Sequence, residues 1–357
     1  MENLYYTHFS HIDFKDSFFD SLNNDYPGFS GWVEKKKNDP SALAYVLFNE
    51  QNCIEGFLYL KIENESITDV TPQLPMRKHL KVGTFKFESR GTLRGERFIK
   101  KIFDHALECN ADDIYVTVYP KHAYLIRLFN SFGFDIVGLK GPADNAENVL
   151  LKEMQHPHLT GDIVNDYPFI HHSDSNRKFI LSVDPSYHTN LFPDSILRTE
   201  SPSIVSDVSH TNSIRKIYIC AMQGVTSFRP NDIVLIYRTN KGLPGRAYYN
   251  SVITSLCVVN NVRHIDEFET EDSFINYCKK YSVFDVNNLS YFYRTKKYPF
   301  IVSFTYNIAF PKRPNRAKLI SDVGLDSSAY WGVLDLSDQQ FEHIIKLGAV
   351  DESIIIN

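Results

Sequence analysis

The chain has 357 residues, which predicts two domains because a domain usually spans roughly 100–200 residues. Its content of 43% hydrophobic and 23% charged residues is typical of a soluble globular protein and excludes an acidic, core-poor disordered chain. The net charge of −5 excludes a strongly basic protein that is held to nucleic acid by bulk charge alone.

The cysteines and the N-terminal residues favour a cytoplasmic protein. The five cysteines are an odd number and no two are spaced C-x-x-C, which argues against a disulfide framework and against a cysteine-based zinc site. We therefore expect free thiols in a reducing compartment. The first residues lack the basic and apolar segments of a signal peptide, and no run of about 18 apolar residues predicts a membrane span.

The first part of the chain mixes strand and helix patterns. Ala42–Phe48 and Cys53–Ile62 are apolar runs joined by a short polar break, which predicts a β-hairpin. Alternation predicts a strand over Leu80–Phe87, and apolar residues at helical spacing predict a helix over Arg94–Leu107. A strand, a helix that stops at Gly133 and two closing strands follow at Asp113–Tyr119, Tyr124–Phe132, Phe134–Leu139 and Val149–Leu151.

The segment Gln155–Asn176 breaks this periodicity with proline, glycine and histidine. We therefore predict a linker over 155–177 between domains at 1–154 and 178–357. The histidines of the segment have no acidic or thiol partner at a ligand spacing, so the sequence predicts no metal site.

The second part of the chain is richer in strands. Short β-rich runs parted by turn residues are expected at Lys178–Val183, Arg215–Cys220, Asp232–Arg238, Ser251–Val259 and Tyr298–Phe310. Helices are expected at Glu271–Tyr281, Asn315–Val323 and Ser337–Leu347, the last opened by a capping-box pattern. His188 lies in a predicted short helix and is interpreted as structural. Strands with added helices predict a small β-barrel-like α+β domain.

The turn between the strand Leu80–Phe87 and the next helix carries the main chemical signal. A Gly-containing turn that opens a helix makes an anion site, because unpaired N–H groups and the helix dipole favour negative charge. Gly91 and Gly95 would let a phosphate-bearing ligand approach the backbone, and nearby arginines add positive charge. The candidate ligand contacts of this turn are Arg90, Gly91, Thr92, Leu93, Arg94, Gly95 and Glu96.

The order of elements and two motifs resemble the GNAT family of N-acetyltransferases over residues 1–154. The family's turn has the form Arg/Gln-x-x-Gly-x-Gly/Ala, and here it is Arg90-Gly91-Thr92-Leu93-Arg94-Gly95, with Leu93 in place of the middle glycine. Arg127–Phe134 is similar to the family's second segment, Arg-Leu-Tyr-x-x-x-Gly-Phe. The resemblance implies an α/β (α+β) mixed-sheet fold whose splayed strands admit acetyl-CoA, with the pyrophosphate on this turn and the pantetheine beside Phe85 and Phe87.

The resemblance also implies catalytic roles. Phe129 stands where the family often has a tyrosine that protonates the leaving thiolate, and a phenyl ring is expected only to pack against the CoA arm. Tyr124, Tyr119, His122 or water could supply the proton, and the sequence does not choose among them. The attacking amine must be neutral, so a general base is expected near the end of the strand. Glu88 is the candidate, with a solvated carboxylate or an arginine partner as the alternative.

Residues 178–357 resemble, more loosely, the PUA-like superfamily of small barrels, which includes PUA, ASCH and EVE domains. Phe228–Arg238 is similar to the family's turn into an apolar strand, although Asn231 replaces the usual glycine, and Trp331–Leu336 resembles its closing segment. The resemblance implies binding of RNA or a modified DNA base. Two clusters interleave rings, which can stack on bases, with cations, which can meet phosphates. Their candidate contacts are Arg294, Lys296, Lys297, Lys312, Arg313 and Arg316.

Together these patterns predict an acetyl-CoA-dependent N-acetyltransferase whose PUA-like domain selects an RNA, for example tRNA, or an RNA-bound substrate. Two alternatives stay open: a catalytically silent acyl-CoA-binding fold in a nucleic-acid reader or regulator, and an enzyme that acetylates a small-molecule amine. Residues 1–154 hold 18 Lys and Arg against 22 Asp and Glu, so the negative charge lies mainly in the acetyltransferase-like part. The nearly neutral remainder suits a selective pocket better than a polyelectrolyte clamp.

Overall fold

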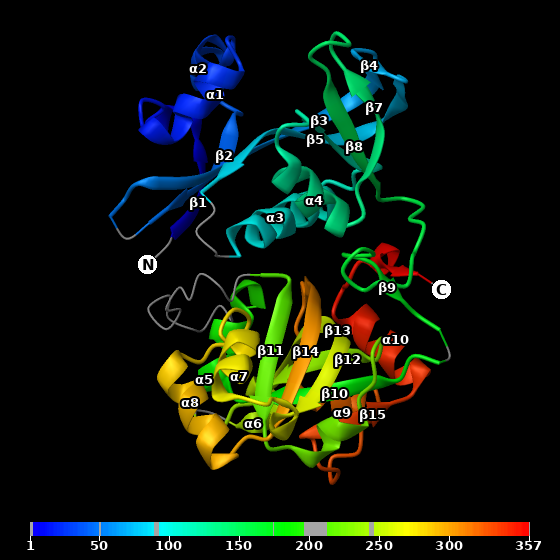
Figure 1. The fold of residues 1–357 in the computed structure, drawn as a ribbon. Coiled ribbons are helices and arrows are strands. Elements are labelled where there is room, and N and C mark those ends of the chain that lie inside the picture. The colour runs from blue at the N-terminus through cyan, green and yellow to red at the C-terminus, as the bar shows by residue number, and fades with distance from the viewer. Residues whose placement is uncertain are drawn as a thin grey trace. The chain divides into compact units, whose positions relative to one another are not determined.

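The computed structural model describes residues 3–49, 51–88, 93–173, 175–195, 213–242 and 246–356. The chain divides into two compact units, Met1–His158 and Leu159–Asn357, and each is described by itself (Figure 1). Both units combine a mixed sheet with helices, so the fold is mixed α+β.

The first unit is built on an eight-stranded sheet with the order β1-β2-β3-β5-β6-β8-β7-β4. Its strands are β1 (Asn3–His8), β2 (Leu43–Phe48), β3 (Ile54–Ile67), β4 (Val70–Thr71), β5 (Leu74–Phe87), β6 (Asp113–Val118), β7 (Asp135–Lys140) and β8 (Glu147–Glu153). Neighbouring strands are antiparallel except for β5 and β6, which run parallel. The predicted hairpin is the β2–β3 pair, and the predicted strand over Leu80–Phe87 is the second half of β5.

A β-bulge at Gly83 divides β5. Tyr59 and Leu60 are adjacent on β3, but their partners on β5 are Thr84 and Val82, so Gly83 is the additional residue. A bulge bends its strand and disrupts the neighbouring ladder. A side chain at Gly83 would press on β3, since a Cβ atom there would lie 2.8 Å from Cδ1 of Tyr59. The bulge is therefore packed closely against the strand that it faces.

The parallel pairing of β5 with β6 is short. It covers His79–Val82 of β5 and Asp113–Val116 of β6. At its start, Nδ1 of His79 lies 2.6 Å from Oδ1 of Asp113, and both side chains are buried. Beyond the bulge, β5 continues to Phe87 with β3 on one side and no described strand on the other. The two strands therefore diverge toward their C-terminal ends.

Helices cover both faces of this sheet, as Figure 1 shows. They are α1 (Asp20–Asp25), α2 (Phe29–Lys37), α3 (Arg94–Glu108) and α4 (Ala123–Ser131). On β3, Phe57 contacts the rings of Phe9 and Phe19 in the core cluster that α1 and α2 cover. The adjacent Gly56 faces the other way, where a Cβ atom would lie 2.5 Å from the Phe98 ring of α3. Since neighbouring residues of a strand point to opposite faces, α1 and α2 lie on one face and α3 on the other.

The second unit contains a six-stranded sheet with the order β11-β14-β13-β12-β10-β15. Its strands are β10 (Lys178–Val183), β11 (Arg215–Cys220), β12 (Ile233–Arg238), β13 (Val252–His264), β14 (Phe300–Ala309) and β15 (Val333–Leu336). β10 and β12 are parallel, and the other pairs are antiparallel. The predicted small barrel is not confirmed, because within the described ranges the pairing runs from β11 to β15 without closing.

Helices pack around this second sheet. They are α5 (Pro185–Leu191), α6 (Ala247–Asn250), α7 (Glu271–Cys278), α8 (Val286–Thr295), α9 (Arg316–Ser321) and α10 (Asp338–Leu347). The predicted capping box is confirmed at α10, where the Ser337 hydroxyl accepts from the Gln340 N–H and the Gln340 side chain accepts from the Ser337 N–H. Helix α8 is absent from the sequence prediction, although Leu289 and Phe292 form its buried stripe. His188 is fully buried in α5, where burial lowers its pKa.

The histidine-rich segment crosses the division between the units. Its later part packs into the second unit, where Tyr167 and Phe169 are buried. β9 (Ile170–His171) pairs there with β16 (Ile355–Ile356). In the part of the chain that the structure describes, no group of three or more His, Cys, Asp or Glu side chains could hold a metal ion. None of the described helices is long and apolar enough to cross a membrane.

The five free cysteines differ in exposure, which predicts their reactivity. Cys53 is exposed and Cys109 is half-buried. Cys220, Cys257 and Cys278 are buried, and burial raises the pKa of Cys220 and Cys278 to about 12. The thiolate is the reactive form. Ellman's reagent should therefore modify Cys53 fastest in the native protein, and Cys53→Ser should remove that phase. Rapid native modification of the three buried thiols would contradict this structure.

Candidate functional site

A cavity of about 870 Å³ opens where β5 and β6 diverge. Its walls come from residues 82–87 of β5, residues 116–118 of β6, residues 121–125 at the start of α4, and parts of α1, α2 and β3. Phe85 and Tyr124 line it from the α3 and α4 face, whereas Lys61 and Lys86 line it from the α1 and α2 face. The cavity therefore connects the two faces of the sheet through the gap between the strands.

Aromatic side chains form the wall on the α3 and α4 face. The ring centroids of Phe85 and Phe87 are 5.3 Å apart, and those of Phe87 and Tyr124 are 6.1 Å apart. These three predicted site residues thus lie together on the cavity wall. Tyr124 is exposed, so its hydroxyl is available to a ligand. The arrangement offers an apolar surface with one proton donor at its edge.

Phe129 lies behind this wall. It is fully buried, and its ring contacts those of Phe85 at 5.7 Å and Phe134 at 4.9 Å. It is not among the residues that line the cavity. Its place in the core differs from the expected direct contact with the CoA arm: Phe129 supports Phe85 from behind.

Arg94, the first residue of α3, takes part in a buried ion pair. Its Nη2 atom pairs with Oε2 of Glu55 at the start of β3, and its Nη1 atom donates to the carbonyl oxygen of Glu88 at 3.1 Å. The N–H of Glu88 donates to the carbonyl oxygen of Glu55 at 2.8 Å. The ion pair and the two hydrogen bonds hold the end of β5 and the start of α3 against β3. The structure thus gives Arg94 a role in holding the end of β5 and the start of α3, which its prediction as a ligand contact did not include.

Gly95 allows close packing of α3. A Cβ atom there would lie 2.9 Å from Cδ2 of Leu128 on α4 and 3.0 Å from Cζ of Phe87. Any larger residue would push α3 away from α4 and β5. This is a different reason for the glycine from the predicted approach of a phosphate to the backbone.

The start of α3 keeps features of an anion site. Leu93 is its N-cap residue and provides no side-chain hydrogen bond to the first turn. The first turn of a helix directs its N–H groups out of the helix, where they can bind an anion. Arg90, Gly91 and Thr92 lie outside the described residues.

The predicted general base, Glu88, is half-buried and does not line the cavity. The carboxylates that do line it are Asp25, Glu63 and Glu147. Sequence reasoning missed them because they come from α1, β3 and β8, which are remote from the motif. These three carboxylates are therefore candidate bases beside Glu88.

Two of these carboxylates have different partners. Asp25 is held by cations, with Nζ of Lys121 at 2.5 Å and Nε2 of His122 at 3.4 Å. Glu147 accepts a hydrogen bond from the Tyr26 hydroxyl at 3.3 Å. Burial and the adjacent Glu147 raise the pKa of Tyr26, so Tyr26 stays protonated as a donor. Among the described carboxylates that line the cavity, Glu147 is the one without an ion pair, which leaves it able to accept a proton.

A charged row lies on the α1 and α2 face of β3 and β5. Lys61 is directly opposite Lys81 in the antiparallel register, and Glu63 is two residues along the same face. Oε1 of Glu63 lies 2.6 Å from Nζ of Lys61 and 3.7 Å from Nζ of Lys81. The Tyr115 hydroxyl donates to Oε2 of the same carboxylate. The alternation of charged residues along the β2–β3 hairpin is the sequence signal that could have placed this row.

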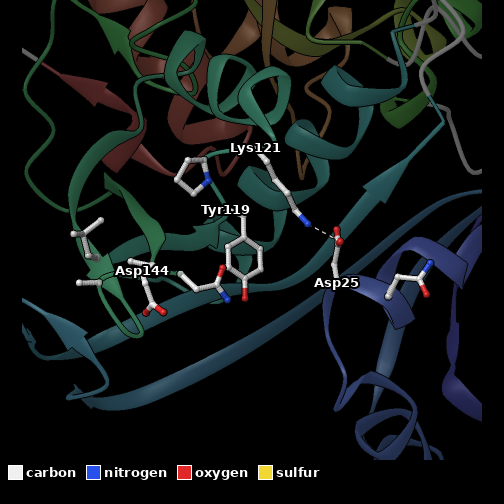
Figure 2. Close-up of a pocket in the computed structure, with 10 residues that line it drawn as sticks. Asp25, Tyr119, Lys121 and Asp144 are labelled. Carbon is white, nitrogen blue, oxygen red and sulfur yellow. Dashed lines mark hydrogen bonds and ion pairs between the residues drawn. The ribbon is translucent and has the colours of Figure 1, made fainter.

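A smaller hollow of about 560 Å³ shares Asp25 and Lys121 with the main cavity. Figure 2 shows the Lys121 ammonium directed at the Asp25 carboxylate, with Tyr119 beside them. Asp144, on the loop between β7 and β8, lies across from Tyr119 in the same view. The hollow extends the space for a ligand beyond the gap between the strands.

The candidate nucleic-acid contacts of the second unit are placed at two sites. Arg294 pairs with Glu271 at 3.1 Å, and Lys296 pairs with Asp266 at 3.1 Å while lying over the Tyr293 ring. Lys297 lies over neighbouring tyrosine rings, and Arg316 lies 4.2 Å from the Trp331 ring centroid. Lys312 is exposed and Arg313 is half-buried, both before α9.

These two clusters do not form one surface strip. The first cluster lies at the C-terminal end of α8 and the second at the N-terminal end of α9, and these helices are apart in Figure 1. Three of the cations are engaged by carboxylates or by a tryptophan ring. Nothing in these contacts favours an RNA site over an ordinary protein surface.

No protein-family model and no curated protein sequence matches the chain. Solved structures resemble parts of it. One is yncA of Salmonella typhimurium, described as an acetyltransferase with acetyl-CoA, at 13% identity over 44% of this chain and 96% of that chain, with a TM-score of 0.31. Another is NAA60 of Arabidopsis thaliana in complex with acetyl-CoA, at 10% identity over 43% and 99%, with a TM-score of 0.33.

A third solved structure is an ASCH protein of Zymomonas mobilis, at 8% identity over 48% of this chain and 95% of that chain, with a TM-score of 0.31. The yncA and NAA60 structures contain acetyl-CoA. A further matched structure is the NatC complex bound to Gag peptide and CoA. Identities and TM-scores this low assign neither an activity nor a ligand to this chain.

The Arg94–Glu55 pair predicts a specific stability effect. Arg94→Met should lower the free energy of unfolding by about 3–5 kcal/mol, because it leaves the Glu55 carboxylate buried without its cation. The double variant Glu55→Gln/Arg94→Met should recover part of this loss, since no buried charge remains. Urea unfolding of the three proteins measures both effects. Equal stability of Arg94→Met and the native protein would show that the pair does not hold the turn.

Proposed function

We propose that the first unit binds an acyl-CoA and transfers its acyl group to an amine. The observation that carries this proposal is the divergence of β5 from β6 at the Gly83 bulge, with a cavity at the gap. A pantetheine arm is narrow, extended and carries two amide groups. It can take the place of the strand that β5 lacks beyond Val82, because an extended chain adds to an open strand edge through main-chain hydrogen bonds.

The other residues of the wall fit the same ligand. Phe85 and Phe87 provide an apolar surface beside the open edge. The start of α3 favours an anion through its N–H groups and the helix dipole, which suits the pyrophosphate of CoA. The open edge and the helix start therefore support one extended ligand with an anionic end.

The residues of the cavity suit amine acylation. An acyl-CoA supplies a thioester, so that a carbon–nitrogen bond forms to the amine as the carbon–sulfur bond breaks. We assign to Glu147 the removal of the amine proton, because it lines the cavity without an ion pair. We assign to Tyr124 the delivery of a proton to the sulfur, which leaves as a free thiol. The first assignment differs from the predicted base Glu88, and the second selects Tyr124 from the donors that the sequence left open.

Selection of an RNA acceptor by the second unit stays a prediction without support from the described contacts. The silent-fold alternative predicts acyl-CoA binding without thiol release. A screen of free-thiol production from acetyl-CoA over amino acids, polyamines, nucleosides and tRNA separates these possibilities. Release with any amine excludes the silent fold.

The binding half of the proposal is tested by calorimetry on the full chain. Acetyl-CoA should bind, and 3′-phospho-ADP, which keeps the pyrophosphate and lacks the pantetheine, should bind at least about tenfold more weakly. The reason is that the open edge of β5 contributes contacts to the pantetheine alone. Absence of acetyl-CoA binding would overturn the proposal, and equal affinities would overturn the role of the strand edge.

Glu147→Gln should lower kcat/KM for the acceptor by about 100-fold or more at neutral pH, since the base is lost while the fold and acyl-CoA affinity remain. Its activity should recover as the pH rises, because the free amine then becomes neutral without help. Glu88→Gln is the matched control and should stay near native activity. Near-native activity of Glu147→Gln together with a large loss in Glu88→Gln would show that Glu88 is the base.

Tyr124→Phe should lower kcat by about tenfold, a modest effect because a thiol with a pKa near 8.5 is already a fair leaving group. Acyl-CoA affinity should be unchanged, because the ring still packs on Phe87. Tyr119→Phe serves as the control, since Tyr119 is another proton donor that the sequence offered and it lines the smaller hollow. A full loss in Tyr119→Phe with none in Tyr124→Phe would reverse the assignment.

A further inference from the structure

Positive charge is concentrated in the main cavity. Six lysines line it against three carboxylates, although residues 1–154 as a whole carry more acidic than basic side chains. The lysines are Lys36, Lys61, Lys81, Lys86, Lys121 and Lys140. An acidic unit that lines a cavity with an excess of cations creates a local potential that favours an anionic ligand.

The pair Lys61 and Lys81 is the centre of this excess. The two residues are direct cross-strand partners on one face, an arrangement that destabilises a sheet when the charges are alike. Glu63 is the carboxylate that both approach, at 2.6 Å and 3.7 Å. Two ammonium groups therefore share one carboxylate, whose other oxygen already accepts from the Tyr115 hydroxyl.

Two of the six lysines pair with carboxylates outside the cavity lining, Lys36 with Asp39 and Lys140 with Asp69, and the other four still outnumber the three lining carboxylates. Lys140 pairs with Asp69 at 2.7 Å, so that pair is neutral by itself. Burial lowers the pKa of Lys81, and Lys140 and Lys61 act in the same direction, while Glu63 and Asp69 oppose them. An anion beside Lys81 would offset the cost of holding this charge in the cavity.

We infer that the acceptor is a small amine that also carries a carboxylate or phosphate group, which Lys61 and Lys81 bind on the α1 and α2 face of the sheet. This inference rests on the proposed function. It places the anionic end of the acceptor on the face opposite the start of α3, where the acyl-CoA is proposed to bind. The amine would then approach the thioester through the gap between β5 and β6.

The test compares matched acceptor pairs. Each pair consists of an amino acid or aminoalkyl phosphate and its neutral amide, ester or alcohol, and thiol release from acetyl-CoA is measured. The native protein should prefer the anionic member. Lys61→Met/Lys81→Met should raise KM for that member by about 10- to 100-fold and leave the neutral member unchanged, because charge-assisted hydrogen bonds are lost.

Two control variants accompany this pair. Lys35→Met, which removes an exposed lysine of α2 outside the cavity, should change neither KM nor the preference. Lys81→Arg should keep the preference, because it keeps the charge. If the double variant fails to fold, Lys61→Met alone replaces it, since Lys61 is about half exposed.

The outcomes separate this inference from the proposed function. Equal use of anionic and neutral acceptors, with turnover intact, overturns the inference and leaves the proposed function standing. If no acceptor is used and no acetyl-CoA binds, the proposed function fails. Calorimetry with inorganic phosphate then tests the anion site at Lys61 and Lys81. Weaker phosphate binding to Lys61→Met/Lys81→Met than to the native protein supports the site, and equal binding overturns it.

Discussion

The parallel contact between β5 and β6 lasts for four residues, and the site depends on its being so short. A buried contact between His79 and Asp113 fixes where the pairing begins. The pairing ends at Val82, immediately before the bulge at Gly83, where the extra residue bends β5. With a regular ladder, the two strands would stay hydrogen-bonded to their ends and the sheet would have no gap. The position and width of the cavity thus follow from the register of β5 against β3 and β6, and not from the identity of any catalytic side chain.

The period of two along a strand then divides the chemistry between the faces of the sheet. Phe85 and Phe87 face α3 and α4, which gives an apolar wall beside the start of α3. Lys61 and Lys81 face α1 and α2, which gives a cationic wall. The two proposed substrates therefore approach from opposite sides, and neither must pass the other. The Arg94–Glu55 pair contributes by holding the end of β5, the start of α3 and β3 together.

Local patterns predicted most elements of the first unit, since apolar spacing reflects the faces that helices and strands bury. The divergence of the strands was expected only by resemblance, because a one-residue register shift at Gly83 leaves no pattern in composition. The site residues were predicted less completely than the secondary-structure elements. Phe85, Phe87, Tyr124 and His122 line the cavity, but Glu88 does not, and its backbone N–H continues the pairing with β3 at Glu55. In the second unit, the expected barrel is not confirmed, because the described pairing from β11 to β15 does not close. The polar, tyrosine-rich sequence of α8 concealed its buried stripe.

The open edge of β5 has a consequence for the behaviour of the protein in concentrated solution. A strand edge with free N–H and C=O groups is a template for pairing with a strand of another molecule, and so for aggregation. Here the edge forms one wall of a cavity, with β6 and the start of α4 opposite. A second protein's sheet is too thick to enter such a gap, whereas a single slender chain is not. The unpaired edge of β5 thereby stays accessible to a narrow ligand, while the walls of the cavity oppose pairing with the sheet of another molecule.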